Sequence, residues 1–368
     1  MVHRVQASID LQALQHNFRV ARKHTQARHV AAIIKANAYG HGMVEAAQAL
    51  NEAELFGVTD VHEALTLKQA GVETPILILQ GMMRPDDVKL VAENHFQLVV
   101  HAPEQLKTLD ELLSPLTLDE PLTLWLKMDS GMGRLGIDPA SYATTWRALK
   151  ARPWVKDVVM MTHLANSSMP DSPLNLQQLK RFRDVESQLT EDKPVTSIPS
   201  SSGILSGLDT GCDWARPGIM LYGSSPFDWQ QENLRREAFD LKAVMTLQAQ
   251  LIAVKDLKAG DNIGYCSQFI CPRDMRAGIV SLGYADGYPS NAPNGTPVLV
   301  DGQRTTTVGR VSMDMLAVDL DPIPGASPGD LVTLWGQDLS LDEVAAKTGI
   351  LSYNFTCSVA RRVEFTYR

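Results

Sequence analysis

The chain has 368 residues, of which 44% are hydrophobic and 21% are charged, and its formal net charge at pH 7 is −8. A negative chain without clustered lysines and arginines argues against a nucleic-acid-binding protein, because binding to phosphates needs such clusters. No stretch approaches the roughly 18 consecutive apolar residues that a membrane-spanning helix requires. The length suggests two domains, although one α/β barrel can hold more than 200 residues.

The first residues, MVHRVQASID, lack the charged and then apolar profile of a signal peptide. An amphipathic helix is predicted to begin after Asp10. We therefore expect a cytoplasmic protein.

Short apolar runs alternate with helical patterns through the first 225 residues. The runs predict eight strands, at residues 30–35, 54–58, 75–79, 96–100, 122–128, 158–164, 194–198 and 218–223. Helical periodicity lies between them, for example at residues 43–53, 61–71, 103–113 and 174–189. Eight βα units favour a closed (β/α)8 TIM-type barrel over an open sheet, and we place this domain at residues 1–235.

Lys35 follows the first predicted strand of this barrel, at the end where barrel enzymes assemble their active sites. A desolvated lysine there could form a Schiff base with a carbonyl compound. A lysine that extends to solvent or pairs with a carboxylate explains the position equally well. Position alone leaves both interpretations open.

Residues 236–368 have a different character, because strand-like runs follow one another closely and turns rich in Pro, Gly and Asp separate them. The expected strands are residues 241–254, 276–283, 296–302, 305–311, 315–320 and 330–336. One helix is evident, at residues 341–349. These patterns predict a mostly β C-terminal domain.

The four cysteines, Cys212, Cys266, Cys271 and Cys357, are too few and too scattered for a disulfide framework. Only Cys266 and Cys271 are close in sequence, and their CxxxxC spacing is a poor zinc signature. We expect reduced thiols and no metal site.

Seven segments resemble the motifs of alanine racemases, in the same order along the chain. They are IIKANAYGHG (33–42), LKMDSGMGRLG (126–136), MTHLANS (161–167), DWARPGIMLYG (213–223), NIGYCSQF (262–269), LGYADGYP (282–289) and GRVSMDM (309–315). The first is shared in looser form with other pyridoxal phosphate (PLP) barrel proteins, whereas the later ones together are specific to the racemases. The resemblance implies a PLP enzyme that interconverts L- and D-alanine and supplies D-alanine for peptidoglycan.

The resemblance also implies two catalytic residues. Lys35 would hold PLP as a Schiff base and act as one acid and base, and Tyr265 would act on the opposite face. Racemisation removes the α-proton from one face and returns it on the other, so two bases suit the reaction. A phenol is a weak base near pH 7 unless a neighbour stabilises the phenolate, and His163 matches that neighbour.

Further residues match the family's cofactor site. Arg216 would donate to the pyridine nitrogen of PLP, and a guanidinium cannot hand that nitrogen a proton. The matches for phosphate contacts are Ser201, Gly218, Ile219, Tyr39 and Tyr353. The choice of Ser201 over Ser200 or Ser202 is open, because this chain reads SSS where many relatives have Asn-Ser-Ala.

The resemblance also implies which residues contact the substrate. Arg134 matches an arginine on the side of the substrate carboxylate, and Lys127 matches a lysine that can be carbamylated to orient it. Met313, Asp314 and Tyr284 match residues that narrow the entrance and surround the carboxylate. Because these and Tyr265 belong to the second domain, the family's head-to-tail homodimer is implied, in which each β domain caps the partner's barrel.

Alternatives remain for the reaction. Cys266 stands where glycine is common, which leaves the substrate range open to serine or a broader set of amino acids. A barrel-type amino-acid decarboxylase shares PLP, the lysine and a β domain. A PLP-homeostasis protein without turnover is disfavoured, since such barrels lack a second domain.

Overall fold

The computed structural model describes residues 4–82, 84–116, 118–189, 193–208 and 211–368. The chain divides into two compact units. The barrel unit comprises residues 18–38 and 43–221, and the β unit comprises residues 1–17, 39–42 and 222–368. Within the described ranges, no helix has the length and apolar character needed to cross a membrane.

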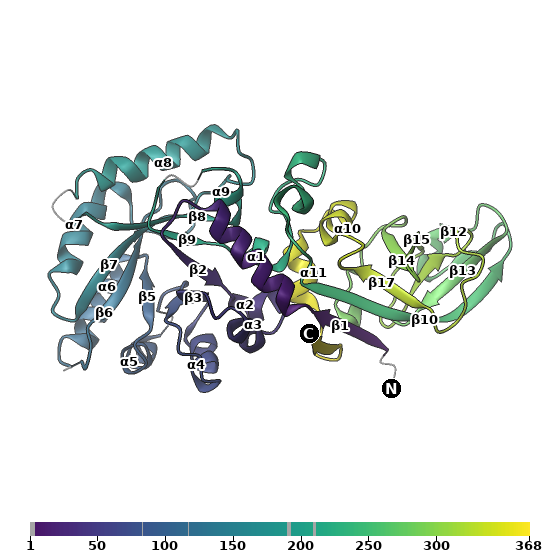
Figure 1. Cartoon of the computed structure of the whole chain (residues 1–368), viewed down its shortest axis with the longest axis horizontal. Coiled ribbons are helices and arrows are strands. Elements are labelled where there is room, and N and C mark those ends of the chain that lie inside the picture. Colours follow the sequence, from purple (N-terminus) through teal and green to yellow (C-terminus); the bar gives the residue numbers. More distant parts are fainter. Residues whose placement is uncertain (1–3, 83, 117, 190–192, 209–210) are drawn as a thin grey trace. The chain divides into compact units, whose positions relative to one another are not determined.

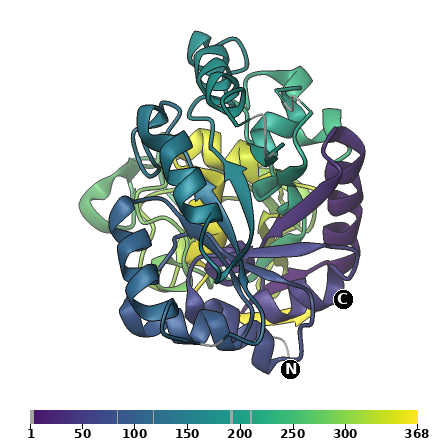
Figure 2. The same ribbon diagram turned by 90° about the vertical axis from the view of Figure 1, so that its left-hand side faces the viewer.

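Eight parallel strands close the barrel unit, as predicted, and helices surround them (Figures 1 and 2). The strands are β2 (His29–Ile33), β3 (Leu55–Val58), β4 (Ile76–Ile78), β5 (Gln97–Val100), β6 (Leu122–Lys127), β7 (Val155–Met161), β8 (Val195–Ser200) and β9 (Trp214–Arg216). The helices are α3 (Met43–Ala49), α4 (Val61–Gln69), α5 (Pro85–Glu93), α6 (Pro103–Leu113), α7 (Pro139–Lys150), α8 (Pro173–Glu186) and α9 (Ser201–Leu205). Two more helices, α1 (Leu11–His24) and α2 (Lys35–Gly40), adjoin β2 in sequence.

The last barrel strand lies earlier than the sequence pattern indicated. The apolar run at residues 218–223 was expected to be a strand, but residues Ile219–Tyr222 form the 3-10 helix η1. Pro217 follows β9, and the Leu221 N–H donates to the Gly218 carbonyl at 2.8 Å, which closes a turn. A short buried apolar run occurs in turns as well as in strands, so the sequence pattern could not distinguish a turn from a strand here.

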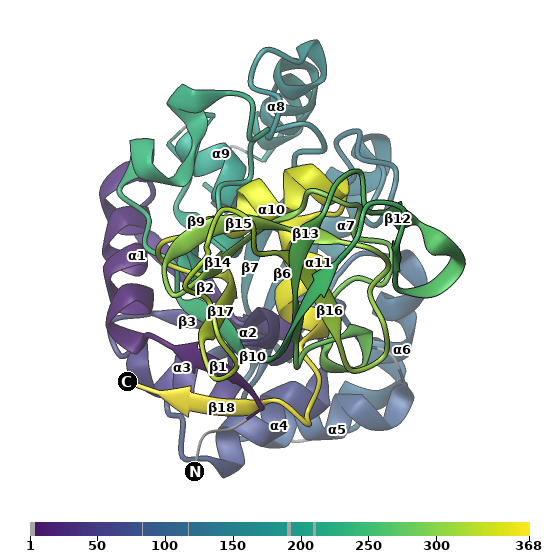
Figure 3. The same cartoon turned by 90° about the vertical axis from the view of Figure 1, so that its right-hand side faces the viewer.

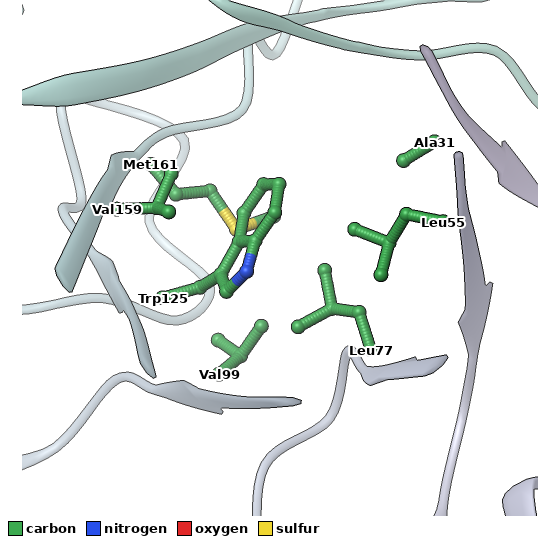
Figure 4. Packing of buried hydrophobic residues seen from close by; sticks show 7 residues of the cluster. All are labelled: Ala31, Leu55, Leu77, Val99, Trp125, Val159 and Met161. Atoms are coloured by element: carbon green, nitrogen blue, oxygen red, sulfur yellow. The ribbon is translucent and has the colours of Figure 1, made fainter. Parts of the chain in front are cut away.

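The barrel interior is filled by side chains from alternating strand positions. Trp125 projects into the middle of this cluster, and its indole N–H donates to Gln97 Oε1 at 2.7 Å (Figure 4). The other members are Ala31, Leu55, Leu77, Val99, Val159 and Met161. This packed core leaves the strand ends as the places where polar side chains can gather.

In the β unit, eight strands are ordered β13-β16-β15-β14-β17-β10-β1-β18, and β10 also pairs with β13 (Figure 3). Their bounds are β1 (Val5–Ile9), β10 (Met245–Leu257), β13 (Met275–Val280), β14 (Pro297–Val300), β15 (Gln303–Val308), β16 (Leu316–Asp319), β17 (Leu331–Trp335) and β18 (Glu364–Tyr367). A two-stranded sheet joins β11 (Asn262–Ile263) to β12 (Phe269–Ile270). The helices are α10 (Leu341–Thr348) and α11 (Ser352–Ser358), with 3-10 turns η2 (Glu232–Leu234), η3 (Arg236–Phe239), η4 (Tyr265–Ser267) and η5 (Tyr284–Asp286).

The predicted mostly β character of the C-terminal part is confirmed, with additions. Strand β1 was not expected, yet it lies between β10 and β18, antiparallel to the first and parallel to the second. Helix α11 was also missed. The division at residue 235 stays a prediction.

Candidate functional site

Five of the expected residues follow or end barrel strands on one rim. Lys35 comes after β2, Lys127 ends β6, His163 comes after β7, Ser201 follows β8, and Arg216 ends β9. Because the strands are parallel, their carboxyl ends meet at the same edge of the barrel. The barrel therefore brings these residues to the rim where such folds hold their reactive groups.

Lys35 begins an unusual turn, because φ of the next four residues, Ala36, Asn37, Ala38 and Tyr39, is 53° to 54°. Non-glycine residues pay for this left-handed conformation, so a run of four must be held by its surroundings. One restraint is Glu63 at the start of α4. Its carboxylate accepts the Ala36 N–H at 2.7 Å and, through the other oxygen, the Thr59 N–H at 2.7 Å.

Arg216 is buried, and its guanidinium donates hydrogen bonds to residues at the ends of the neighbouring strands. It donates to the Thr162 carbonyl at 2.6 Å, the Ile198 carbonyl at 3.1 Å and Ser197 Oγ. It also lies 3.4 Å from His163 Nδ1. Burial lowers the pKa of Arg216 to about 10, so the group stays protonated at neutral pH.

His163 is held as a neutral imidazole. Burial lowers its pKa well below the ordinary value, and the neighbouring Arg216, Lys127, Arg134 and Lys35 lower it further. With Nδ1 facing a guanidinium donor, Nδ1 accepts and the proton belongs on Nε2. The ring can then donate one hydrogen bond from Nε2.

Lys127 is buried at the end of β6 among other cations. Burial lowers its pKa to about 8, and Arg216, Arg134 and Lys35 add to the effect, while Asp129 opposes it. Positive charges gathered in this way repel one another, so the cluster favours binding of an anion or loss of a charge.

Arg134 is exposed and lies in the loop after β6. Asp129 shapes this loop, because its carboxylate accepts the N–H groups of Gly131, Met132 and Gly133 at 2.8 to 3.1 Å. Burial raises the pKa of Asp129, but the three N–H donors outweigh it and the pKa is lowered. Hydrogen bonds between Asp129 and the backbone of its own loop thus hold the conformation of the loop.

Ser201 opens α9 and is buried. Its Oγ accepts the Gly218 N–H at 2.8 Å and the Met220 N–H at 3.3 Å. In this structure the Gly218 N–H, expected as a phosphate donor, is therefore paired with Ser201. Ile219 is buried at the start of η1.

In the β unit, the structure brings together two of the expected phosphate contacts. The ring centroids of Tyr39 and Tyr353 are 5.9 Å apart, and Tyr222 lies 4.8 Å from Tyr39. Burial raises the pKa of Tyr353 to about 12, with a contribution from Asp342, and burial raises that of Tyr39 still further. Both phenols stay protonated at neutral pH and can donate.

Tyr265, Tyr284 and Met313 are exposed in the β unit, with 67%, 43% and 53% of their surface accessible. Tyr265 begins η4, where Cys266 has φ 61° and its Sγ accepts from Arg310 at 3.8 Å. All three are large side chains whose apolar surface is open to solvent.

Tyr284, Met313 and Asp314 lie on two loops that are joined by backbone hydrogen bonds. The Tyr284 N–H donates to the Ser312 carbonyl at 3.0 Å, and the Ala285 N–H donates to the Met313 carbonyl at 2.9 Å. The structure therefore places these three residues on neighbouring loops, and their contact with a substrate stays a prediction.

Sequence reasoning missed the residues that support the site. Glu63 lies in a helix predicted for other reasons, and Thr162, Ser197 and Ile198 contribute to Arg216 through positions in ordinary strand sequence. Asp286 lay inside the quoted segment LGYADGYP, but nothing in its spacing marked it.

Comparisons with known proteins agree over nearly the whole chain. Residues 9–226 match the family model described as "Alanine racemase, N-terminal domain", and residues 244–367 match "Alanine racemase, C-terminal domain". The chain is 44% identical over 356 residues to an alanine racemase of Pseudomonas taetrolens, covering 96% of each chain. It is equally similar, over the same share of each chain, to a catabolic alanine racemase of Pseudomonas putida.

Solved structures give the same result. The biosynthetic alanine racemase of Pseudomonas aeruginosa is 40% identical and superposes with a TM-score of 0.94, covering 100% of both chains. The alanine racemase of Acinetobacter baumannii is 33% identical, with a TM-score of 0.92 and the same coverage. The chain belongs to the alanine racemase family.

Proposed function

We propose that this protein interconverts L- and D-alanine with PLP, by a mechanism in which Lys35 and Tyr265 act as the two bases. The proposal rests above all on the barrel rim, where the cationic side chains Lys35, Lys127, Arg134 and Arg216 surround the neutral His163. Family membership supports the reaction, and the relatives named above are called alanine racemases.

The residues at the rim fit PLP. The positive charges of Lys127, Arg134 and Arg216 suit an anionic phosphorylated aldehyde, and Lys35 supplies an amine that can condense with it. Arg216, protonated and rigidly held, suits the pyridine nitrogen as a hydrogen-bond donor. When bound, PLP supplies an electron sink that makes the α-proton of an amino acid acidic.

The neutral phenols of Tyr39 and Tyr353 are suited to donate to the cofactor phosphate, because both keep their protons well above neutral pH. Ser201 uses its Oγ as an acceptor for two N–H groups, which leaves its hydroxyl proton to donate. We assign Gly218 and Ile219 to the same contact region, since they adjoin Ser201.

For the proton transfers we assign Lys35 to one face of the substrate and Tyr265 to the other. A base on each face allows the α-proton to leave from one side and return from the other. His163, neutral and with Nε2 free to donate, is the group we assign to stabilise the Tyr265 phenolate. Arg134, Met313 and Asp314 are assigned to the substrate carboxylate, and Tyr284 to the entrance.

We further propose that Lys127 is carbamylated. Carbon dioxide reacts with a neutral amine, and a pKa of about 8 leaves a larger neutral fraction than an ordinary lysine has. The product would be an anion among Arg134, Arg216 and Lys35. Intact mass under native conditions should show a gain of one carbon dioxide that is lost in Lys127→Ala; a mass equal to that of the unmodified chain would contradict the proposal.

We propose a homodimer in which residues 236–368 of one subunit complete the site on the barrel, residues 1–235, of the other. The exposure of Tyr265, Tyr284 and Met313 supports this arrangement. The product D-alanine would serve peptidoglycan synthesis. The relatives include a biosynthetic and a catabolic enzyme, so both directions of the reaction should be measured.

The decisive experiment incubates the protein and PLP in deuterium oxide with single enantiomers of alanine, serine, lysine or glutamate. We expect inversion and α-deuteration of alanine above all, loss of both in Lys35→Ala, and impaired proton transfer in one direction in Tyr265→Phe. Inversion of serine at a similar rate would indicate a broader racemase, and loss of carbon dioxide from the substrate a decarboxylase. Bound PLP without any inversion would refute the proposal.

A further inference from the structure

Asp286 is a fully buried carboxylate at the end of η5, two residues after Tyr284. Its Oδ2 accepts the Gly283 N–H at 2.9 Å. Its Oδ1 accepts from two arginines at opposite ends of the sequence, Arg362 Nε at 2.8 Å and Arg4 Nη2. A single buried oxygen thus ties the first and last segments of the chain to the Tyr284 turn.

The same two arginines continue to the neighbouring loop. Arg362 donates through Nη2 to Asp314 Oδ1, and Arg4 Nη1 lies 3.3 Å from the Asp314 carbonyl. Arg4 is itself fixed, because its Nη1 donates to the Ser281 carbonyl at 2.9 Å and its carbonyl accepts from Ser281 Oγ at 2.9 Å. Asp314 is therefore held on both its backbone and its side chain.

Two carboxylates and two guanidinium groups balance in charge within this network. If Asp286 lost its charge, both arginines would lose their contact with an anion there, and Arg362 would draw the Asp314 carboxylate toward itself while Arg4 kept only its contacts with the Ser281 and Asp314 carbonyls. The Tyr284 turn is also packed closely against the backbone of Ser358, because a Cβ on Gly287 (φ +104°) would meet the Ser358 carbonyl oxygen at 2.2 Å.

We propose that Asp286 is a positioning residue for substrate binding: through Arg4 and Arg362 it fixes Asp314 beside Tyr284, which presets the loops that receive the substrate carboxylate. The inference rests on the proposed function, since it assumes that these loops meet the amino acid. Asp286 is enclosed by protein, so it acts through the arginines and the Gly283 N–H and not by touching the substrate.

The test compares Asp286→Asn with Asp321→Asn. Asp321 is a matched control in the same unit, because it also accepts from an arginine, Arg273, and from a backbone N–H, that of Arg276. For Asp286→Asn we expect the KM for alanine to rise about tenfold while kcat changes less than about threefold, and Asp321→Asn to leave both unchanged.

A second variant, Arg362→Met, keeps the Asp286 carboxylate and its contact with Arg4 but removes both hydrogen bonds of Arg362, to Asp286 and to Asp314. Combined with Asp314→Asn, it should add little to the KM of the worse single variant, because both variants act on the one contact between Arg362 and Asp314. Arg362→Lys, which keeps the positive charge, should raise the KM for alanine less than Arg362→Met does. Additive effects, or a normal KM in Asp286→Asn, would overturn the proposal.

Binding of propionate, a carboxylate that carries no amine and cannot react, gives a readout without turnover. Its stabilisation of the native protein in thermal unfolding should weaken in Asp286→Asn and Arg362→Met and persist in Asp321→Asn. If the native protein inverted no alanine, the proposed function would fail, and propionate binding would still decide whether Asp286 presets the loops. Equal stabilisation in all variants would refute that role.

Discussion

At the scale of single residues, the barrel rim shows how burial sets charge. His163 and Lys127 lie in the same cationic surroundings, and burial lowers the pKa of each, so each gives up its proton more readily than in water. These pKa shifts also affect folding, because a side chain whose pKa differs between the folded and unfolded states makes the free energy of unfolding depend on pH.

His163 should cause a loss of stability in acid. Its folded pKa lies below the unfolded value, so below the ordinary histidine pKa the unfolded chain binds a proton that the folded chain refuses. Stability is then lost as the pH falls, by up to about 1.4 kcal/mol per pH unit from this group. Urea unfolding without added PLP, from about pH 7.5 to about pH 5.5, should show a shallower pH dependence in His163→Gln than in the native protein. Equal slopes would contradict the expectation.

At the scale of elements, the pattern of apolar runs predicted the barrel because eight buried parallel strands each leave a continuous apolar signal. It misplaced the last strand, since the run at residues 218–223 is buried as a 3-10 turn. It could not reveal the left-handed turn after Lys35, because ANAY contains no glycine to mark positive φ. The identities of most site residues came from resemblance, whereas their supports, such as Glu63, depend on contacts that no spacing encodes.

The left-handed turn gives an unusual expectation for glycine. Ala36 is exposed there, so Ala36→Gly should relieve backbone strain and leave the protein as stable as before or up to about 1 kcal/mol more stable. Ala148 is exposed in the right-handed helix α7, and Ala148→Gly should cost about 0.5 to 1 kcal/mol. Chemical denaturation of both variants gives the sign of the change in the free energy of unfolding for each. If both substitutions destabilised the protein equally, the turn would carry no such strain.

At the scale of the whole molecule, the proposed site draws on two subunits, and this can be tested by mixing inactive variants. Lys35→Ala lacks the barrel base, and Tyr265→Ala lacks the base on the β unit. If one subunit supplies each, a mixed dimer contains one site with both bases. Random exchange should then recover about a quarter of the native activity. Each variant alone, taken through the same exchange, is the control, and no recovery in a demonstrated mixed dimer would mean that both bases come from one chain.

The pairing of β1 with both β10 and β18 constrains when the β sheet can form during synthesis of the chain. Synthesis proceeds from the N-terminus at about 5 to 20 residues per second, so residues Val5–Ile9 leave the ribosome roughly 20 to 70 s before Glu364–Tyr367 exist. For that interval the first strand has an unpaired edge, which is the kind of surface that attracts other chains. The barrel strands that follow can close meanwhile, but the β sheet is completed only when residues Glu364–Tyr367 have been made. Synthesis of β18, and not closure of the barrel, is therefore the event that completes this sheet.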